Sequence, residues 1–566
     1  MNLTKVTIEG GNPNSLFMGR YSFFNCPIEE VVLNRDLSYE VHFDKYGSYQ
    51  MGAPFNATTL RSIKIGPLVT SIGPYLFRSC NKVEEVTIPK TISSIGDNAF
   101  GRCSSLKKLI IESGDAILGL KGAYAATFED CPLEEIFLGR TLDYDDSESG
   151  VFEFKESLTS LTIGDKVTRI SNYEFNNTSI ESITIPNSVV EIGTGAFNGC
   201  RKLKKVNFED GREELDIIPD KYSYITTFQD CPIESLYLGR SLSRCPFQGN
   251  TYLTSVVVGE CSSIVSSAFS GCTGLLSVEI SDSVLQIGGG AFENCSELTT
   301  FIFPKFITSI SGDIFNGCNK LQSIDIPNSV ITIGDGAFYG CESLRSVALP
   351  SKLTSIGSSA FSDCKGLTSV PLPDTLTDIG TSAFRGCVGL ASIILPSMIT
   401  SIEPQTFEGC VSLTSITLPY SVTSVGDYAF KGCVALTEIN SLNTTPPVIK
   451  ENTFDEVTYE NAILNIPFGC KTIYWLHPYW ENFYNIVEKE FPTTGIAEVV
   501  SENSDCGYRL GGYGVTFTKD GEAVGVYTIQ GTLIYSGKSS LGQTVELTPN
   551  TIYIIKLGGQ TTKIVF

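Results

Sequence analysis

A single spacing of 23 residues constrains this chain more than any other feature of its sequence. Eight cysteines follow one another in seven equal steps of that length: Cys272, Cys295, Cys318, Cys341, Cys364, Cys387, Cys410 and Cys433. A phenylalanine stands three residues before each of them, from Phe269 to Phe430. Fixed periods of roughly 20 to 50 residues are typical of stacked repeats, in which each unit buries its apolar face only against its neighbours. We therefore expect a solenoid.

One repeat unit, residues 413–433, reads LTSITLPYSVTSVGDYAFKGC. It predicts a strand, a turn at Pro419, a second short extended segment and a helical turn that begins near Gly426. The spacing L-x-x-I-x-L places three apolar residues inward: Leu413, Ile416 and Leu418. Phe430 and Cys433 are expected to point inward from the opposite wall. The predicted fold is a right-handed β-α superhelix in which parallel strands lie about 4.8 Å apart.

The N-terminal half carries a second, longer repeat. Three related segments read FNCPIEEVVLNR, FEDCPLEEIFLGR and FQDCPIESLYLGR, at residues 24–35, 128–140 and 228–240. Each is followed by a variable excursion, near residues 37–54, 142–152 and 242–246, which we interpret as a loop that projects from the solenoid. Coil ends of the Phe-x-x-Cys type, or their equivalents, predict about 16 coils within residues 1–445.

The pattern I-P-x-S-V-x-x-I-G-x-x-A-F-x-G-C, as in residues 326–341, resembles the BspA-like leucine-rich repeats of bacterial cell-surface and secreted proteins. The resemblance implies a leucine-rich-repeat solenoid over about 440 residues. Residues 446–490 are predicted to form a C-terminal capping unit, because residues 462–488 resemble the closing unit of such arrays. We interpret its aromatic residues as an apolar cap, with a carbohydrate-stacking platform as the alternative: Trp475, Tyr479, Trp480 and Phe483.

Residues 495–566 show a different pattern. Apolar residues alternate in runs such as 524–529 and 552–557, and FPTT at residues 491–494 has the composition of a boundary. The runs predict a separate, small all-β domain that folds independently. They are similar to C-terminal β-sandwich modules of secreted bacterial proteins, which implies a role in sorting or surface attachment.

Charge and motif content exclude several classes of protein. The chain has 566 residues, with 62 acidic against 40 basic side chains and a net charge of −22, which disfavours nucleic acid as a partner. The two histidines, His42 and His477, lie far apart, and neither G-x-S-x-G nor H-E-x-x-H occurs. We therefore predict no enzymatic activity and no cofactor.

No run of apolar residues is long enough for a transmembrane segment, and the first ten residues, MNLTKVTIEG, lack the features of a signal peptide. Because Leu3, Val6 and Ile8 already fit the core pattern, we expect that the start is cut and that an export signal and leading repeats have been removed.

Most of the 18 cysteines occupy one repeated inward position in a chain with ample core, so they are interpreted as a stack of buried free thiols. Four cysteines fall outside that position: Cys245, Cys261, Cys470 and Cys506. Cys245 with Cys261 is the only pair considered for a disulfide.

One excursion is rich in carboxylates: Asp143, Asp145, Asp146, Glu148 and Glu153. Oxygen ligands at alternate positions are a weak candidate for a calcium site. The segment lacks a glycine-anchored pattern of twelve residues, so a solvated acidic loop is the preferred interpretation and no metal is predicted.

The resemblance implies a secreted or cell-surface recognition and adhesion protein that binds host or other cell-surface proteins, as a monomer. The alternatives are a glycan-binding accessory protein and a structural surface spacer. The ligand surface is expected in the N-terminal half, because the regular half presents a column of serine and threonine from Ser277 to Ser415, whereas binding needs larger anchors. The partner-binding candidates are Tyr39, Phe43, Tyr46, Tyr49 and Tyr144.

Overall fold

The computed structural model describes residues 3–11, 15–19, 22–23, 26–43, 49–51, 53–55, 59–121, 127–145, 149–219, 226–491, 508–511, 514–517, 520–528, 533–540, 543–547, 552–557 and 560–565. The chain divides into two compact units, residues 1–390 with 406–411, and residues 391–405 with 412–566.

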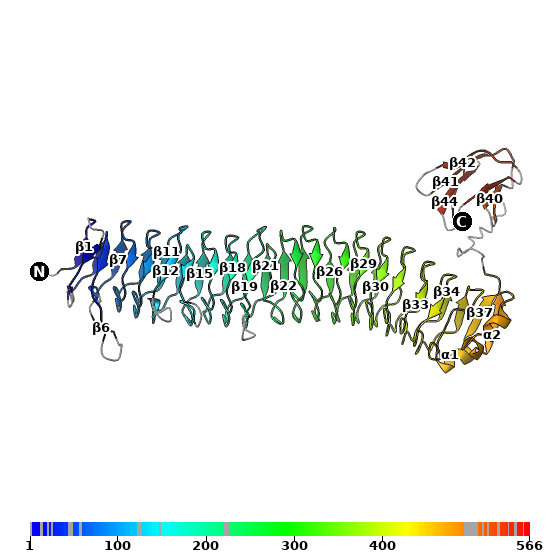
Figure 1. Cartoon of the computed structure of the whole chain (residues 1–566), viewed down its shortest axis with the longest axis horizontal. Helices are drawn as coiled ribbons and strands as arrows, with labels where there is room; N and C mark the ends of the chain where they lie inside the picture. The colour runs from blue at the N-terminus through cyan, green and yellow to red at the C-terminus, as the bar shows by residue number, and fades with distance from the viewer. Residues whose placement is uncertain are drawn as a thin grey trace. The chain divides into compact units, whose positions relative to one another are not determined.

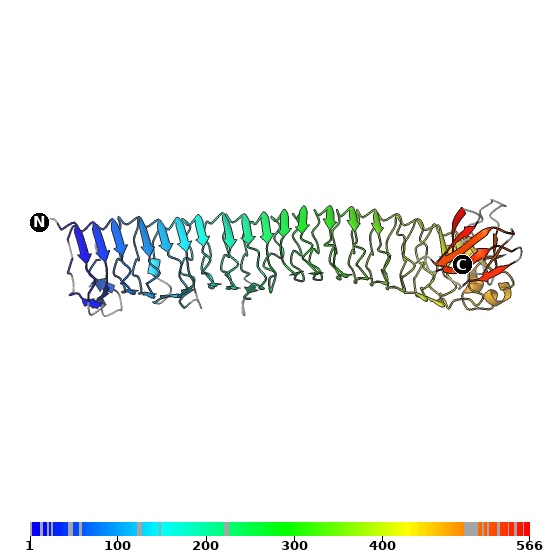
Figure 2. The same cartoon turned by 90° about the horizontal axis from the view of Figure 1, so that it is seen from above.

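The first unit is a stack of coils, and each regular coil contributes a longer and a shorter strand. The longer strands are β1 (Lys5–Ile8), β3 (Glu30–Leu33), β7 (Ser62–Ile65), β9 (Glu85–Ile88), β11 (Lys108–Ile111), β13 (Glu135–Leu138), β15 (Ser160–Ile163), β17 (Ser182–Ile185), β19 (Lys205–Phe208), β21 (Ser235–Leu238), β22 (Ser255–Val258), β24 (Ser277–Ile280), β26 (Thr300–Ile302), β28 (Ser323–Asp325) and β30 (Ser346–Ala348). They pair in parallel and in register, and Figure 2 shows them aligned along one face of this unit.

The shorter strands form a second set of parallel ladders. They are β2 (Ser15–Phe17), β4 (Asp36–Ser38), β8 (Ser71–Ile72), β10 (Ser94–Ile95), β12 (Leu118–Leu120), β14 (Leu142–Asp143), β16 (Arg169–Ile170), β18 (Glu191–Ile192), β20 (Asp216–Ile217), β23 (Ser263–Ile264), β25 (Gln286–Ile287), β27 (Ser309–Ile310), β29 (Thr332–Ile333), β31 (Ser355–Ile356) and β32 (Asp378–Ile379). One hairpin, β5 (His42–Phe43) with β6 (Tyr49–Met51), departs from the coil (Figure 1). The predicted leucine-rich-repeat solenoid is confirmed.

The structure has about 20 turns, more than the 16 predicted. Several coils end without the repeated cysteine, as at Lys155, Thr178 and Asn250. Within the second predicted excursion, Leu142 lies in β14 and Phe152 is buried in the core.

Phenylalanine rings form the centre of the first unit. Neighbouring rings stack from Phe55 to Phe247 and again from Phe269 to Phe407, with centroids 5.2 to 5.9 Å apart. Aromatic pairs of this kind contribute about 0.5–1.5 kcal/mol each beyond the burial of their area. Within each of the two runs, the stacked rings therefore link neighbouring coils.

The repeated cysteines lie in the same turn of each coil as the stacked phenylalanines. The Cys341 thiol donates to the carbonyl oxygen of Phe315 at 3.3 Å, and the Cys364 thiol donates to that of Phe338 at 3.2 Å. The repeated column is buried, as the sequence indicated, and the 17 cysteines that the structure describes are free thiols, including Cys245 and Cys261. Cys506 lies outside the described residues. Burial raises the pKa of Cys272 and of Cys318 to about 12.

The coils of the longer repeat have a shorter corner. A regular corner reads C-x-x-L, as in residues 341–344, but three coils read C-P-L or C-P-I, at residues 26–28, 131–133 and 231–233. Further along the second and third of these coils stand two buried arginines, Arg140 and Arg240. The Arg240 guanidinium donates to the carbonyl oxygens of Pro186 at 3.0 Å and Asn187 at 3.2 Å, two coils back.

The Arg140 side chain repeats this arrangement with the carbonyl oxygens of Pro89 and Lys90. A glycine in the intervening coil leaves room for each arginine: a Cβ on Gly211 would stand 3.3 Å from Cδ of Arg240. Each arginine therefore links its own coil to the coil two before it, across the coil between them. We call these two side chains struts. Burial lowers the pKa of both guanidinium groups.

The second unit continues the parallel pattern and then closes it. Its strands are β33 (Ser401–Ile402), β34 (Ser415–Leu418), β35 (Ser424–Val425), β36 (Glu438–Ser441), β37 (Ile463–Pro467) and β38 (Asn485–Lys489), and its helices are α1 (Glu456–Asn461), α2 (Lys471–Trp475) and the 3₁₀ turn η2 (Trp480–Asn482). Trp480 is buried, and its Nε1 donates to the carbonyl oxygen of Pro447 at 2.7 Å. Phe483 is also buried, so both residues cap the apolar end as expected.

Trp475 is not part of that apolar cap, since 66% of its surface is exposed. Tyr474 takes the inward position instead, and its hydroxyl donates to the carbonyl oxygen of Asn443 at 2.8 Å. Consecutive residues of a helix point about 100° apart, so Tyr474 and Trp475 cannot both face inward. Tyr479 is half-buried.

Residues 508–565 contain antiparallel strands: β39 (Tyr508–Gly511), β40 (Gly514–Phe517), β41 (Ala523–Thr528), β42 (Leu533–Lys538), β43 (Thr544–Glu546), β44 (Ile552–Leu557) and β45 (Gln560–Val565). They form two sheets with the orders β39-β40-β43 and β42-β41-β44-β45. Val515, Phe517, Val526 and Ile555 are among the members of a hydrophobic cluster confined to these strands. The change of pattern in the sequence thus corresponds to a change from parallel to antiparallel pairing.

We expect the native protein to react very slowly with a thiol reagent. Thiols with a pKa near 12, such as Cys272 and Cys318, are less than about one part in a thousand thiolate at pH 8, and burial blocks access to them. After denaturation without reductant, at least about 14 thiols should react. A denatured count near zero would contradict the stack of free thiols.

We expect Arg240→Ala to lower the free energy of unfolding by about 2–4 kcal/mol, because it removes two charge-assisted hydrogen bonds made by a buried side chain. Urea unfolding followed by circular dichroism measures this change. The exposed Arg244 offers a matched control, whose substitution by alanine should stay within about 0.5 kcal/mol. Equal effects of the two substitutions on the free energy of unfolding would contradict a stabilising role of Arg240.

Candidate recognition surface

The outward faces of the long strands form a regular surface along the first unit. The first and third residues of a strand point outward and the second points inward, as in β30, where Ser346 and Ala348 are exposed and Val347 is buried. In-register pairing stacks equivalent residues into columns. The expected column of small residues is present: Ser277, Thr300, Ser323 and Ser346 are all exposed.

The same half also exposes larger apolar side chains that the sequence analysis missed. Ile302, at the third position of β26, is 77% exposed, and Phe306 in the turn after it is 63% exposed. The signal was available in the sequence, because the third strand position is outward in every coil.

Ion pairs mark the coils of the longer repeat on this face. Glu30 lies between Lys5 and Lys64, with nitrogen–oxygen distances of 3.3 and 2.7 Å. Hydrogen bonds from the two lysines, with that of Lys64 the stronger influence, lower the pKa of Glu30. The equivalent pair in the next longer repeat joins Lys108 to Glu135. Pairs one residue earlier in the coil join Lys107 to Glu134 and Lys204 to Glu234. Because all are solvent-exposed, they orient side chains more than they stabilise the fold.

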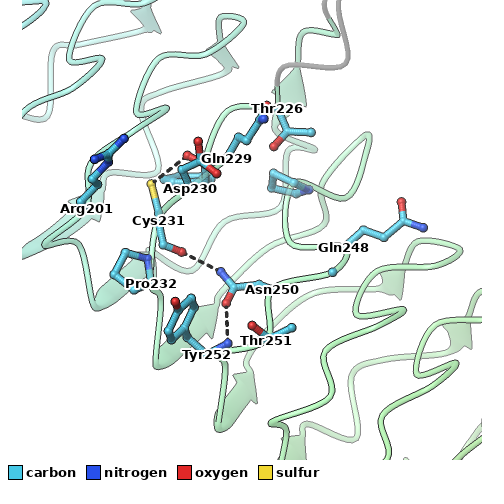
Figure 3. Close-up of a pocket in the computed structure, with 13 residues that line it drawn as sticks. Arg201, Thr226, Gln229, Asp230, Cys231, Pro232, Gln248, Asn250, Thr251 and Tyr252 are labelled. Atoms are coloured by element: carbon cyan, nitrogen blue, oxygen red, sulfur yellow. Dashed lines mark hydrogen bonds between the residues drawn. The ribbon is translucent and has the colours of Figure 1, made fainter.

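Two pockets, which we call notches, open among the turns that follow the short strands. This is the turn side of the coils, and each notch lies beside a Cys-Pro corner. The first notch has a volume of about 560 Å³ and is lined by residues 129–132, 150–151 and 153–157. The second notch has a volume of about 720 Å³ and is lined by residues 226, 228–232, 246 and 248–252 with Arg201 (Figure 3). The lining segments occupy equivalent positions of the longer repeat.

A polar side chain at each notch replaces the repeated cysteine. In the second notch Asn250 Nδ2 donates to the carbonyl oxygen of Cys231 at 3.0 Å, and Asn250 Oδ1 accepts the N–H of Tyr252 at 3.1 Å (Figure 3). In the first notch Lys155 Nζ donates to the carbonyl oxygen of Phe128 at 2.9 Å. That oxygen is the one a cysteine at position 155 would contact in a regular coil. Burial lowers the pKa of Lys155.

The predicted partner-binding residues lie in different environments. The Tyr39 hydroxyl donates to the carbonyl oxygen of Pro74 at 2.8 Å, and its ring is half-buried. Tyr144 is half-buried as well. Phe43 pairs with Tyr49 in the β5–β6 hairpin, while Tyr46 lies outside the described residues.

The carboxylates of the weak calcium candidate are only partly described. Asp143 and Asp145 are exposed, whereas Asp146 and Glu148 lie outside the described residues. Glu153 accepts the N–H of Gly150 at 3.1 Å and Nδ2 of Asn176 at 2.8 Å. In the described part of the chain, no group of three or more metal-ligating side chains comes together.

No helix among the described residues is long and apolar enough to cross a membrane. A comparison with curated proteins finds no match. Three solved structures are similar to parts of this chain. A leucine-rich repeat protein from Bacteroides ovatus ATCC 8483 is 26% identical, covers 71% of this chain and 92% of its own, and gives a TM-score of 0.38.

A leucine rich cell surface protein from Faecalibacterium prausnitzii A2-165 is 25% identical, over 65% of this chain and 90% of its own, with a TM-score of 0.23. The T. pallidum leucine rich repeat protein is 32% identical, over 32% of this chain and 77% of its own, with a TM-score of 0.26.

A family model described as "BspA type Leucine rich repeat region (6 copies)" matches residues 16–149, 121–254, 240–368 and 332–461. These matches overlap into one continuous stretch from residue 16 to residue 461, which is well over half of the chain. The chain therefore belongs to the BspA-type leucine-rich repeat family.

Proposed function

We propose that this chain is a secreted or cell-surface recognition protein that adheres to proteins on host or other cells. The observation that carries the proposal is the outward face of the first unit, where in-register strands hold equivalent side chains in columns. Such a face suits a broad macromolecular partner better than a small substrate, because repeat scaffolds offer extended binding surfaces. The described cell-surface relative supports the same location.

We assign partner binding to the N-terminal half, where excursions follow the short strands β4 and β14. Tyr39 supports this assignment, since its hydroxyl is already held by the Pro74 carbonyl and its ring is half-exposed. An aromatic side chain that is fixed before binding loses little conformational entropy in a complex. Phe43, Tyr46, Tyr49 and Tyr144 belong to the same excursions and complete the proposed set.

A glycan-binding accessory role is the second candidate. Trp475 favours it, because an indole that is 66% exposed is available to stack on a sugar ring. A structural surface spacer, the third reading, would show no specific binding.

Glycan and host-protein arrays probed with the full chain should give protein ligands. We expect binding by the wild type and a loss of at least about tenfold in affinity when Tyr39, Tyr49 and Tyr144 are changed to alanine, since aromatic anchors carry much of the energy of an interface. Trp475→Ala is the control that should leave protein binding unchanged.

Glycan binding that Trp475→Ala abolishes would replace the first candidate by the second. Absence of ligands on both arrays would favour the structural surface spacer. A protein ligand whose affinity is untouched by short turns in place of all three excursions would move the binding surface elsewhere.

We further propose that the C-terminal antiparallel module serves attachment or export and folds independently. Its strands share a hydrophobic cluster of their own, centred on Val515, Phe517 and Val526. Limited proteolysis should cut near Lys489 and release a stable array, and a chain that ends at residue 490 should keep its ligand affinity within about twofold. Unfolding of the solenoid in the shortened chain would contradict the boundary, and loss of binding with normal surface retention would contradict the attachment role.

A further inference from the structure

One column of outward side chains in the regular half alternates between apolar and acidic residues. It is formed by the third residues of four successive long strands, Val257, Glu279, Ile302 and Asp325, and we call it the acidic–apolar column. All four side chains are exposed. Val257 pairs in register with Glu279, and Ile302 with Asp325, while β24 and β26 between these pairs are also neighbours. The alternation ends in the next coil, where Ala348 follows Asp325.

Apolar surface at the centre of this column is larger than Ile302 alone. Ile302 ends β26, and Phe306 lies in the turn that follows it. The equivalent position of the next coil carries Ser329, whose hydroxyl donates to the carbonyl oxygen of Ile307 in the coil before it at 2.6 Å. A phenylalanine has no hydroxyl to make such a bond, so the exposed ring of Phe306 does not link the coils in this way. Apolar groups that are exposed together mark interaction sites more often than single ones do.

A column of small residues runs beside the acidic–apolar column. It is formed by the first residues of the same strands, such as Ser277, Thr300 and Ser323, which are exposed. Residues that are two positions apart in a strand lie about 6.7 Å apart on the same face. Because these side chains are short, the backbone of a partner can approach the sheet here while its longer side chains reach the acidic–apolar column.

The carboxylates of the column can receive positive charge from a partner. The neighbouring Asp282 is already paired with Lys305, at 2.7 Å. Among the described residues, neither Glu279 nor Asp325 forms an ion pair. The whole chain carries a net charge of −22, so its field also favours a cationic partner.

The spacing of the column distinguishes between a helix and a strand in the partner. Neighbouring strands are about 4.8 Å apart, which places the four side chains at about 0, 4.8, 9.6 and 14.4 Å along the column. In an α-helix, residues i, i+3, i+7 and i+10 share one face and lie at about 0, 4.5, 10.5 and 15 Å along its axis. In an extended strand, residues on one face are about 6.7 Å apart, so they fall behind the column by about 2 Å at each step. A helix therefore fits the column and a strand does not.

From these observations we propose that the acidic–apolar column docks a basic amphipathic α-helix of a partner protein, as a second contact surface besides the excursions. Apolar residues at i and i+7 of the helix meet Val257 and Ile302, and lysine or arginine at i+3 and i+10 meets the two carboxylates. Amphipathic helices are commonly recognised through anchors with this kind of spacing. A second copy of the chain does not supply the helix from its described residues, because α1 and α2 have only 6 and 5 residues.

The test uses a fluorescent helical peptide of three heptads, with leucine at the first and lysine at the fourth position of each heptad, and alanine and glutamine elsewhere. In a second peptide of the same composition, each lysine stands at the third position, which lies on the other side of the helix. Binding of both peptides to the full chain is measured by fluorescence anisotropy. We expect the second peptide to bind at least about tenfold more weakly, because its lysines cannot reach the carboxylates while its leucines face the column.

Single substitutions of exposed residues locate the binding surface. Glu279→Lys reverses a charge in the column, and Asp374→Lys is its control, at an exposed carboxylate in a turn outside the column. Ile302→Ser removes a side chain that is 77% exposed, and Ile117→Ser is its control, at a residue that is 56% exposed. Glu279→Lys should weaken binding of the first peptide at least about tenfold, and Ile302→Ser at least about fivefold. Each control should change the affinity less than about twofold.

Equal affinity for the two peptides, equal effects of a substitution and its control, or no binding at about millimolar peptide would each overturn the docking proposal. If the arrays yield a protein ligand but the peptides give one of these results, the docking proposal fails while the proposed function stands. If the first peptide binds as expected but the arrays yield no protein ligand, the proposed function fails alone.

Discussion

The contact between neighbouring coils at the Phe-Cys corner is what the rest of the structure depends on. A single coil has no core of its own, because its inward side chains are covered only by the coils above and below. At this corner the Phe338 ring stacks on Phe361 at 5.2 Å, and the Cys364 thiol donates to the Phe338 carbonyl. Aromatic packing and the capped carbonyl therefore hold the coils at one spacing.

That dependence explains why the fold could be predicted from the sequence. A side chain that must meet its own equivalent in the next coil has to recur at a fixed interval, so the 23-residue spacing of Cys341 and Cys364 reports the register directly. The buried positions of Phe430 and Cys433 follow from the same interval. The cap could be predicted only in part. The side of α2 that faces inward is set by packing against Asn443 and Pro447 rather than by a repeat.

The candidate site was harder to predict, since it rests on contacts between unlike coils. Arg240 reaches Pro186 across a coil whose own contribution is only the space at Gly211, and no periodicity relates those residues. The notches follow Cys-Pro corners that the sequence shows, but their volume depends on how unlike coils pack against each other. Tyr39 was visible as an aromatic residue in an excursion, but its bond to Pro74 was not.

A solenoid built this way can open on one side without losing its register on the other. The strand side is held by ladders such as β13 with β15, so a shortened corner on the turn side can leave a notch there while the register of the strands is kept. The Arg140 and Arg240 struts stand in the same two coils and tie each of them to the coil before last. The coils whose corners are shortened are therefore also the coils that a buried arginine holds in place.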